Sequence, residues 1–160
     1  KDNTTVTIQP PVRGSCGTLA AGEYCDLFAD QNTQISADQP ILVAQYLLST
    51  DGQVGDPAMA FVAPSEQFRS QYAFLTPQEY DENYATIISR NGAQVILGGQ
   101  DVSAQLNETV NDQSIGVLSL QPGQHMIDCS AGCGVLVYGF SQAVSYLFAG
   151  GLDLEPISDF

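Results

Sequence analysis

The chain is made of short apolar runs, rich in β-branched and aromatic residues, that are separated by Gly, Pro, Asn and Asp. This spacing is typical of strands joined by tight turns, and helical periodicity is scarce. Residues 17–19 and 23–28 are predicted to flank a turn at 20–22. The other predicted strands are 5–8, 41–48, 58–62, 71–75, 84–89, 93–97, 115–120, 125–128, 135–140 and 145–148.

Three segments carry more specific predictions. Residues 41–48 are apolar on both faces, with Gln45 as the one polar interruption, so we expect a strand that is covered on both sides. Asn91-Gly92 is a strong signal for a hairpin between the strands that flank it. The polar stretch 98–114 is expected to be a flexible loop.

The order of the elements indicates the fold class. Strands and helices do not alternate as they do in βαβ units, so a parallel sheet is not expected. About eleven short strands in one chain fit two antiparallel sheets packed face to face. The sequence therefore predicts an all-β, jelly-roll-like β-sandwich. We expect residues 1–160 to form a single domain, and a fragment of a larger secreted or surface protein.

The charge of the chain narrows the choice of partners. Eighteen Asp and Glu residues stand against four Lys and Arg residues, for a net charge of −14. Nucleic acid is not expected as a partner, because affinity for phosphate backbones comes from clustered Lys and Arg. Direct membrane insertion is not expected either, because no run reaches the roughly 18 apolar residues of a spanning helix. The acidity serves solubility, or attracts a cation or a basic protein surface.

The four cysteines fall into two pairs that are close in sequence. Each pair brackets a Gly-containing turn, so we favour disulfides Cys16–Cys25 and Cys129–Cys133, while crossed pairing stays open. A four-thiolate zinc site is the rival, but the spacings lack the C-x2-C knuckles of such sites. Disulfides persist in oxidising compartments, so we expect the protein in a periplasm, on a cell surface or in extracellular fluid.

No catalytic residues are expected. A serine or cysteine nucleophile needs a base, and the sole histidine, His125, lies on a predicted strand, where a structural role is the commoner one. The Gly-x-Ser-x-Gly elbow of many hydrolases is missing. Paired carboxylates of the kind that glycosidases use are expected by chance among eighteen acidic residues.

Two acidic loops raise the question of calcium, which takes several oxygen ligands from flexible loops. Asp51 and Asp56 lie in one of these loops, and Asp81 and Glu82 lie in the other. These four carboxylates are the candidate calcium ligands, and the alternative is that both loops are simply solvated. No EF-hand pattern is present, no other cofactor is expected, and the residues that bind a ligand stay unknown.

Aromatic residues are numerous, but tryptophan, on which sugar-binding platforms often rely, does not occur. Most of the Tyr and Phe rings alternate within apolar strands, so they are predicted to belong to the core. The rings in this group are Phe61, Phe74, Tyr138, Tyr146 and Phe148.

The order of several segments resembles the N-terminal domain of the IgGFc-binding protein family. This module occurs in a mucus protein of animals and in many bacterial surface or secreted proteins. The strong acidity with few lysines resembles a bacterial member more than an animal one. The segments that carry the resemblance are PILVAQY (40–46), GDPAM (55–59), PSEQF (64–68), YAFLTP (72–77), YDENY (80–84), VYGF (137–140) and SYLFAGG (145–151).

The resemblance implies a non-catalytic binding or cell-adhesion module of a larger mosaic extracellular protein. Its partners would be a protein or glycan ligand on another cell or surface, together with neighbouring domains of the parent protein. Immunoglobulin binding is not carried over, because no residue here can be matched to that activity. Two alternatives stay open: a calcium-dependent carbohydrate-binding domain, and a purely structural spacer domain in a fibre.

Overall fold

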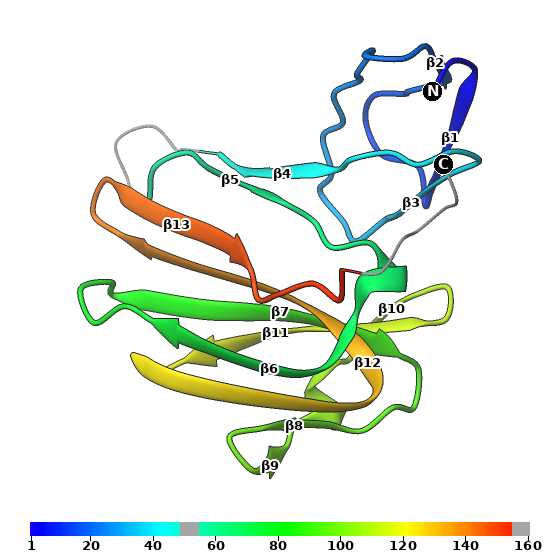
Figure 1. Ribbon diagram of the computed structural model, residues 1–160. Coiled ribbons are helices and arrows are strands. Elements are labelled where there is room, and N and C mark those ends of the chain that lie inside the picture. The colour runs from blue at the N-terminus through cyan, green and yellow to red at the C-terminus, as the bar shows by residue number, and fades with distance from the viewer. Residues whose placement is uncertain (49–54, 155–160) are drawn as a thin grey trace.

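The computed structural model describes residues 1–48 and 55–154 (Figure 1). Within these ranges the chain is nearly all β, with two single-turn 3-10 helices, and no helix is long and apolar enough to cross a membrane. The strands are β1 (Thr4–Gln9), β2 (Thr18–Leu19), β3 (Gln34–Ala37), β4 (Ala44–Leu47), β5 (Ala58–Phe61), β6 (Arg69–Thr76), β7 (Glu82–Arg90), β8 (Val95–Leu97), β9 (Gln100–Asp101), β10 (Glu108–Val110), β11 (Gln113–Leu120), β12 (Gly123–Ser141) and β13 (Val144–Ala149), and the helices are η1 (Ser65–Gln67) and η2 (Ser103–Gln105).

The long strand β12 takes part in both layers of the sandwich. Its N-terminal half pairs antiparallel with β6 and β8, and its C-terminal half pairs with β7 and β13. The register shifts between Asp128 and Cys133, where the strand bends from one layer into the other. One eight-stranded sheet therefore curls over itself, with β6, β8 and β9 in one layer and β13, β7, β11 and β10 in the other (Figure 1).

These pairings confirm the predicted all-β sandwich, but its two layers are not two separate sheets. Residues 125–128 and 135–140 were predicted as separate strands, but they are the two halves of β12. The Gly-containing segment between them bends the backbone without ending the strand, because ladder partners continue on both sides of it. The two layers of the sandwich are therefore parts of one folded sheet.

The main core lies between the two layers of this sheet. Its residues come mainly from β6, β7, β8, β11 and β12, and they alternate along each strand with residues that point outward. Ala85, Ile87, Val95, Ile127 and Val137 are each at most 1% exposed. The alternation of apolar and polar residues in the sequence therefore corresponds to alternation between this buried face and the exposed face of each strand.

The hairpin of β4 and β5 covers part of the outer face of β12 and β13 (Figure 1). Ala60, Leu136 and Leu147 form a second, small core beneath it. The prediction that 41–48 is covered on both sides is wrong, because Tyr46 on the outward face of β4 is 63% exposed. Only one face of this apolar hairpin meets another element of the described chain.

Four of the five rings predicted to be in the core lie in or against it. Phe74 is buried, Tyr146 and Phe148 pack against the main core, and Tyr138 packs against the second core. The prediction for Phe61 is wrong, because this ring lies on the outward face of β5 and is 52% exposed.

The Asn91-Gly92 turn forms, but it does not connect a hairpin. Ala93 N donates a hydrogen bond to Arg90 O at 3.0 Å, and Gly92 has a φ of +78°. The flanking strands β7 and β8 do not pair with each other, since β12 lies between them in the sheet. The turn therefore carries the chain from one layer to the other.

The prediction of a flexible loop at 98–114 is also wrong. This stretch holds β9, η2, β10 and the start of β11. Its two apolar residues Val102 and Leu106 are buried in the main core, at 5% and 7% exposure. The polar side chains around them satisfy local hydrogen bonds, such as the one from Ser103 Oγ to Asp101 Oδ1 at 2.6 Å.

The N-terminal segment forms a small separate sheet in the order β2-β1-β3 (Figure 1). Of residues 1–40 only Thr4 is buried, so this sheet has no hydrophobic core of its own. The Cys16–Cys25 disulfide closes one of its loops. The predicted strand at 23–28 is wrong, because only Phe28 makes a β-bridge there, to Arg13. A hydrogen bond of 2.6 Å from Asn32 Nδ2 to Glu108 Oε2 ties this segment to β10.

Candidate functional site

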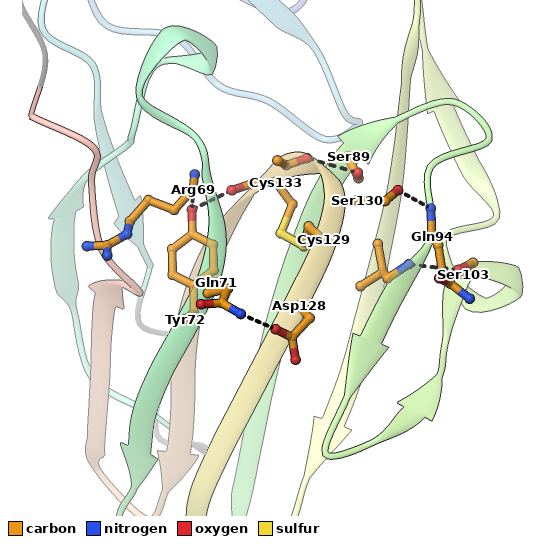
Figure 2. Close-up of a disulfide and its surroundings, with 12 residues drawn as sticks. Arg69, Gln71, Tyr72, Ser89, Gln94, Ser103, Asp128, Cys129, Ser130 and Cys133 are labelled. Carbon is orange, nitrogen blue, oxygen red and sulfur yellow. Dashed lines mark hydrogen bonds between the residues drawn. A yellow bond between two sulfur atoms is a disulfide. The ribbon is translucent and has the colours of Figure 1, made fainter.

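The second disulfide, Cys129–Cys133, holds the bend of β12 (Figure 2). Both cysteines are buried, at 4% and 0% exposure, and their Cα atoms are 5.9 Å apart. Tyr72 Oη donates to the carbonyl of Cys133 and accepts from Arg69 N at 3.0 Å. Burial raises the pKa of the Tyr72 phenol. These contacts stabilise the fold and leave no reactive thiol at the bend.

Two shallow, open grooves on the described surface are lined by a mixture of polar and apolar atoms. One, of about 240 Å³, lies beside the disulfide bend, where Gln71 Nε2 donates to Asp128 Oδ1 at 2.8 Å (Figure 2). The other, of about 360 Å³, lies between the N-terminal sheet and β10. Small-molecule sites usually bury most of the surface of their ligand, so neither of these open grooves has the character of an enclosed ligand pocket.

His125 occupies a structural position. Its Nε2 lies 3.0 Å from Thr76 Oγ1 and 2.8 Å from the Gln121 carbonyl, and its ring packs on Phe74 at a centroid distance of 5.4 Å. The imidazole thus links β6 to the turn that precedes β12. These contacts account for both its position and its hydrogen bonding.

The candidate calcium ligands are only partly described. Asp81 and Glu82 lie at the start of β7, Asp56 lies just before β5, and Asp51 falls outside the described residues. Within the described residues, no group of three or more His, Cys, Asp or Glu side chains is placed to hold a metal ion. Calcium binding at these carboxylates therefore stays a prediction.

The start of β7 and the end of β12 form a surface that we call the acidic–aromatic end, made of Asp81, Glu82, Tyr84, Tyr138 and Phe140. Tyr84 is the register partner of Tyr138, and Glu82 is that of Phe140. The ring centroids of Tyr84 and Tyr138 are 5.5 Å apart, and those of Tyr138 and Phe140 are 5.7 Å apart. All three rings are partly exposed, and both carboxylates are exposed.

Hydroxyl groups hold the two carboxylates of this end. Ser141 Oγ donates to Asp81 Oδ2 at 2.6 Å, and Tyr84 Oη donates to Glu82 Oε2 at 3.1 Å. The bond to Glu82 raises the pKa of the Tyr84 phenol. Each carboxylate keeps acceptor capacity toward solvent, because a carboxylate can accept several hydrogen bonds.

A second group of side chains supports this end from the core side. A Cβ at Gly139 would lie 2.4 Å from Tyr146 Cε1, so the absence of a side chain there makes room for the Tyr146 ring. Tyr146 Oη donates to Asn83 Oδ1 at 2.5 Å, and its ring meets Tyr80 edge to face at 4.7 Å. Burial raises the pKa of Tyr146 to about 12. The rings on the outer face therefore rest on packed strands.

The residues that lead into β5 are attached to the same end. Gly55 N donates to the Ser141 carbonyl at 2.9 Å, and Asp56 N donates to Ser145 Oγ at 2.8 Å. The structure thus brings Asp56, Asp81 and Glu82 to one end of the sandwich, although they come from two loops. Only the side-chain oxygens of Asp81 and Glu82 are held by hydroxyl donors here.

The three rings of this surface were not predicted as functional residues. Rings in half-buried strands resemble core residues, and Tyr138 was predicted to be one. The signal in the sequence is the pair of segments YDENY and VYGF. Their pairing across β7 and β12 depends on non-local register, which the sequence pattern does not contain.

Comparison with known proteins gives one match. Residues 1–139 match a family model described as IgGFc binding protein. This range runs from the first residue into the C-terminal half of β12, and it includes all of the acidic–aromatic end except Phe140. No curated protein and no solved structure matches the chain.

Proposed function

Because the chain belongs to the IgGFc-binding protein family, we propose that it is a non-catalytic module of a larger extracellular adhesion protein, and that its acidic–aromatic end binds a basic segment of a partner protein. Family membership and the two disulfides support an extracellular binding module.

The observation that carries the proposal is that three partly exposed rings and two exposed carboxylates lie together at one end of the sandwich. Tyr and Phe rings contribute large contact areas at interfaces, and their faces attract guanidinium and ammonium groups. Asp81 and Glu82 lie at the same end, where they can pair with the cation that rests on the rings. An Arg or Lys side chain with apolar neighbours is complementary to both features.

The distribution of charge points the same way. The chain has four basic residues, Lys1, Arg13, Arg69 and Arg90. Arg90 ends β7 and Glu82 begins it, so about 26 Å of extended strand separates them. Arg69 is the register partner of Cys133 at the bend of β12. Lys1 and Arg13 belong to the N-terminal segment, where Arg13 lies over the Phe28 ring at 4.4 Å from its centroid. The carboxylates at this end therefore remain available to a basic partner, and the net charge of −14 would attract it.

A direct test uses a short fluorescent peptide of alternating Arg and Leu as the probe, with anisotropy as the readout. The variant Asp81→Asn with Glu82→Gln keeps the side-chain shapes and removes both charges. We expect it to weaken binding at least about tenfold, which is about 1.4 kcal/mol. The matched control, Asp26→Asn with Asp30→Asn, removes two exposed charges of the N-terminal segment.

The control is expected to change the affinity by less than about twofold, because the two charges lie far from the rings and are screened by salt. Equal losses in both variants would show that the peptide responds to net charge alone. That result would contradict a binding site at this end. An Asp81→Asn with Glu82→Gln variant that binds the peptide as tightly as the unmodified chain would also contradict it.

The second candidate function is calcium-dependent carbohydrate binding. It is favoured by the attachment of Asp56 to the same end as Asp81 and Glu82. A glycan array probed with and without a chelator separates the two functions. Glycan signal that disappears on chelation supports the calcium function, and a blank array argues against it. If neither peptide nor glycan binds, the domain is better explained as a spacer in a fibre.

A further inference from the structure

The outward face of the β4–β5 hairpin is apolar and exposed. Large side chains on this face are Leu42, Tyr46 and Leu48 from the first strand and its flanks, and Met59 and Phe61 from the second. Their exposed fractions are 72%, 63%, 73%, 47% and 52%. Isolated exposed apolar residues are common on proteins, but a contiguous group of this size marks an interaction surface.

The arrangement of the hairpin makes these side chains contiguous. Tyr46 is the register partner of Met59, and Ala44 is that of Phe61, so all four side chains lie on one face. The ladder continues beyond the assigned strands, because Val62 N donates to the Val43 carbonyl at 2.9 Å. The opposite face of the hairpin is already used, since its small residues cover β12 and β13.

The hairpin also has a free strand edge. Among the described residues β4 pairs only with β5, and β5 is the strand that packs against β13 (Figure 1). The outer edge of β4 therefore presents unpaired backbone N–H and C=O groups beside the exposed rings. Such an edge is a template for pairing with another strand unless charged residues or proline block it. The strands Ala44–Leu47 and Ala58–Phe61 contain neither.

From these features we propose that the outward face of the β4–β5 hairpin forms the interface of a symmetric homodimer. The outward face of one hairpin would pack against the same face of its partner about a two-fold axis, because pairing the two β4 edges instead would leave both apolar faces exposed on one side of the joined sheet. The two-fold dimer is the commonest symmetric assembly, and it needs only one self-complementary surface. This surface is separate from the acidic–aromatic end, so the two proposals can fail independently.

The area of the face suits a second copy. Five large side chains that are about 60% exposed, each with roughly 200 Å² of surface, leave on the order of 600 Å² of surface per protomer. Two copies would bury about 1,200 Å², which is the lower limit for specific interfaces, so we expect a dissociation constant in the micromolar range. A basic partner is less suited to this face, because its strands carry no carboxylate.

Charge makes a further distinction. Each protomer has a net charge of −14, so the two copies repel each other at low salt although the hairpin strands themselves are uncharged. Salt screens this repulsion, so raising the salt concentration should strengthen the dimer. A complex with a basic partner would instead weaken with salt.

Sedimentation velocity of the full chain, measured from low micromolar to several hundred micromolar protein at two salt concentrations, tests the proposal. We expect a monomer–dimer equilibrium that shifts toward dimer at the higher salt. Tyr46→Glu should shift the dissociation constant at least tenfold toward monomer. The matched control is Leu75→Glu, because Leu75 is 68% exposed on β6, in the other layer of the sandwich, and gains the same charge.

Circular dichroism and thermal melting of both variants check that they fold. The proposal is overturned if the unmodified chain stays monomeric at the highest concentration and salt, in which case the face belongs to a different partner. It is also overturned if Leu75→Glu dissociates the dimer as strongly as Tyr46→Glu does. Loss of dimer in Tyr46→Glu alone, with both variants folded, supports it.

Discussion

Removing each disulfide in turn should show that the bend of β12 is central to the stability of the fold. For Cys129→Ala with Cys133→Ala, the short loop gives an entropic loss of about 2 kcal/mol in the chain-entropy model. The two sulfur atoms are buried, and replacing them should add roughly 1.5 kcal/mol by analogy with buried methylene groups. We therefore expect a loss of about 3.5 kcal/mol in the free energy of unfolding, and a fall of about 10 °C in Tm.

The other disulfide closes a longer loop, so loop entropy alone predicts a larger effect for it, about 2.7 kcal/mol. The structure predicts the opposite order. Cys16 and Cys25 lie in a segment where only Thr4 is buried, so this small sheet should open locally without unfolding the sandwich. For Cys16→Ala with Cys25→Ala we expect less than about 1 kcal/mol of global destabilisation, within the range of many surface changes.

Urea unfolding followed by circular dichroism measures the global loss in both double variants. Hydrogen exchange measured by mass spectrometry shows where protection is lost. We expect residues 1–40 alone to lose protection in Cys16→Ala with Cys25→Ala. An equal or larger global loss in this variant would refute the reasoning, because the N-terminal sheet would then unfold together with the main core.

Three further predictions concern single residues. Gly134→Ala places a Cβ 2.4 Å from Phe68 Cε1, so urea unfolding should show a loss of about 1 to 3 kcal/mol in the free energy of unfolding. Adding Phe68→Leu should restore part of this loss, and no recovery would contradict the contact. Hydrogen bonds from Ser103 lower the pKa of Asp101 from 3.8 to about 2, so the Asp101 carboxylate should stabilise the fold above pH 4 and stop doing so as the pH falls through 2. An NMR titration that gives a pKa near 3.8 for Asp101 would contradict this. Burial raises the pKa of Tyr146 from 10.0 to about 12, so the neutral Tyr146 phenol should stabilise the fold below pH 10 and stop doing so as the pH rises through 12. In an ultraviolet titration the Tyr146→Phe variant should lack the step near pH 12, and a step that persists would rule out the assignment to Tyr146.

Local sequence patterns predicted most of the strands, because alternation and turn residues act over a few neighbouring positions. They did not predict which strands pair. The Asn91-Gly92 turn forms where expected, but β12 lies between its two flanking strands. In 98–114, two apolar residues among many polar ones were too few to indicate burial, yet Val102 and Leu106 both reach the core.

The candidate site shows the same limit. Asp81 and Glu82 could be singled out because acidic residues in loops are visible in the sequence. Tyr84 and Tyr138 could not, because they meet through the non-local pairing of β7 with β12. The exposure of Tyr138 also depends on the β4–β5 hairpin that packs against it. The wrong predictions that 41–48 is covered on both sides and that Phe61 lies in the core have the same cause. An apolar strand has the same sequence pattern whether its second face is covered by its own chain or left exposed.

The central claim, that the acidic–aromatic end binds a basic segment, is tested most directly by NMR. Amide spectra of the full chain are recorded during titration with the peptide of alternating Arg and Leu. We predict saturable shifts that cluster at residues 81–84 and 138–141, and that are lost in Asp81→Asn with Glu82→Gln. Shifts spread evenly over the acidic surface, or centred on another part of the molecule, would contradict the claim.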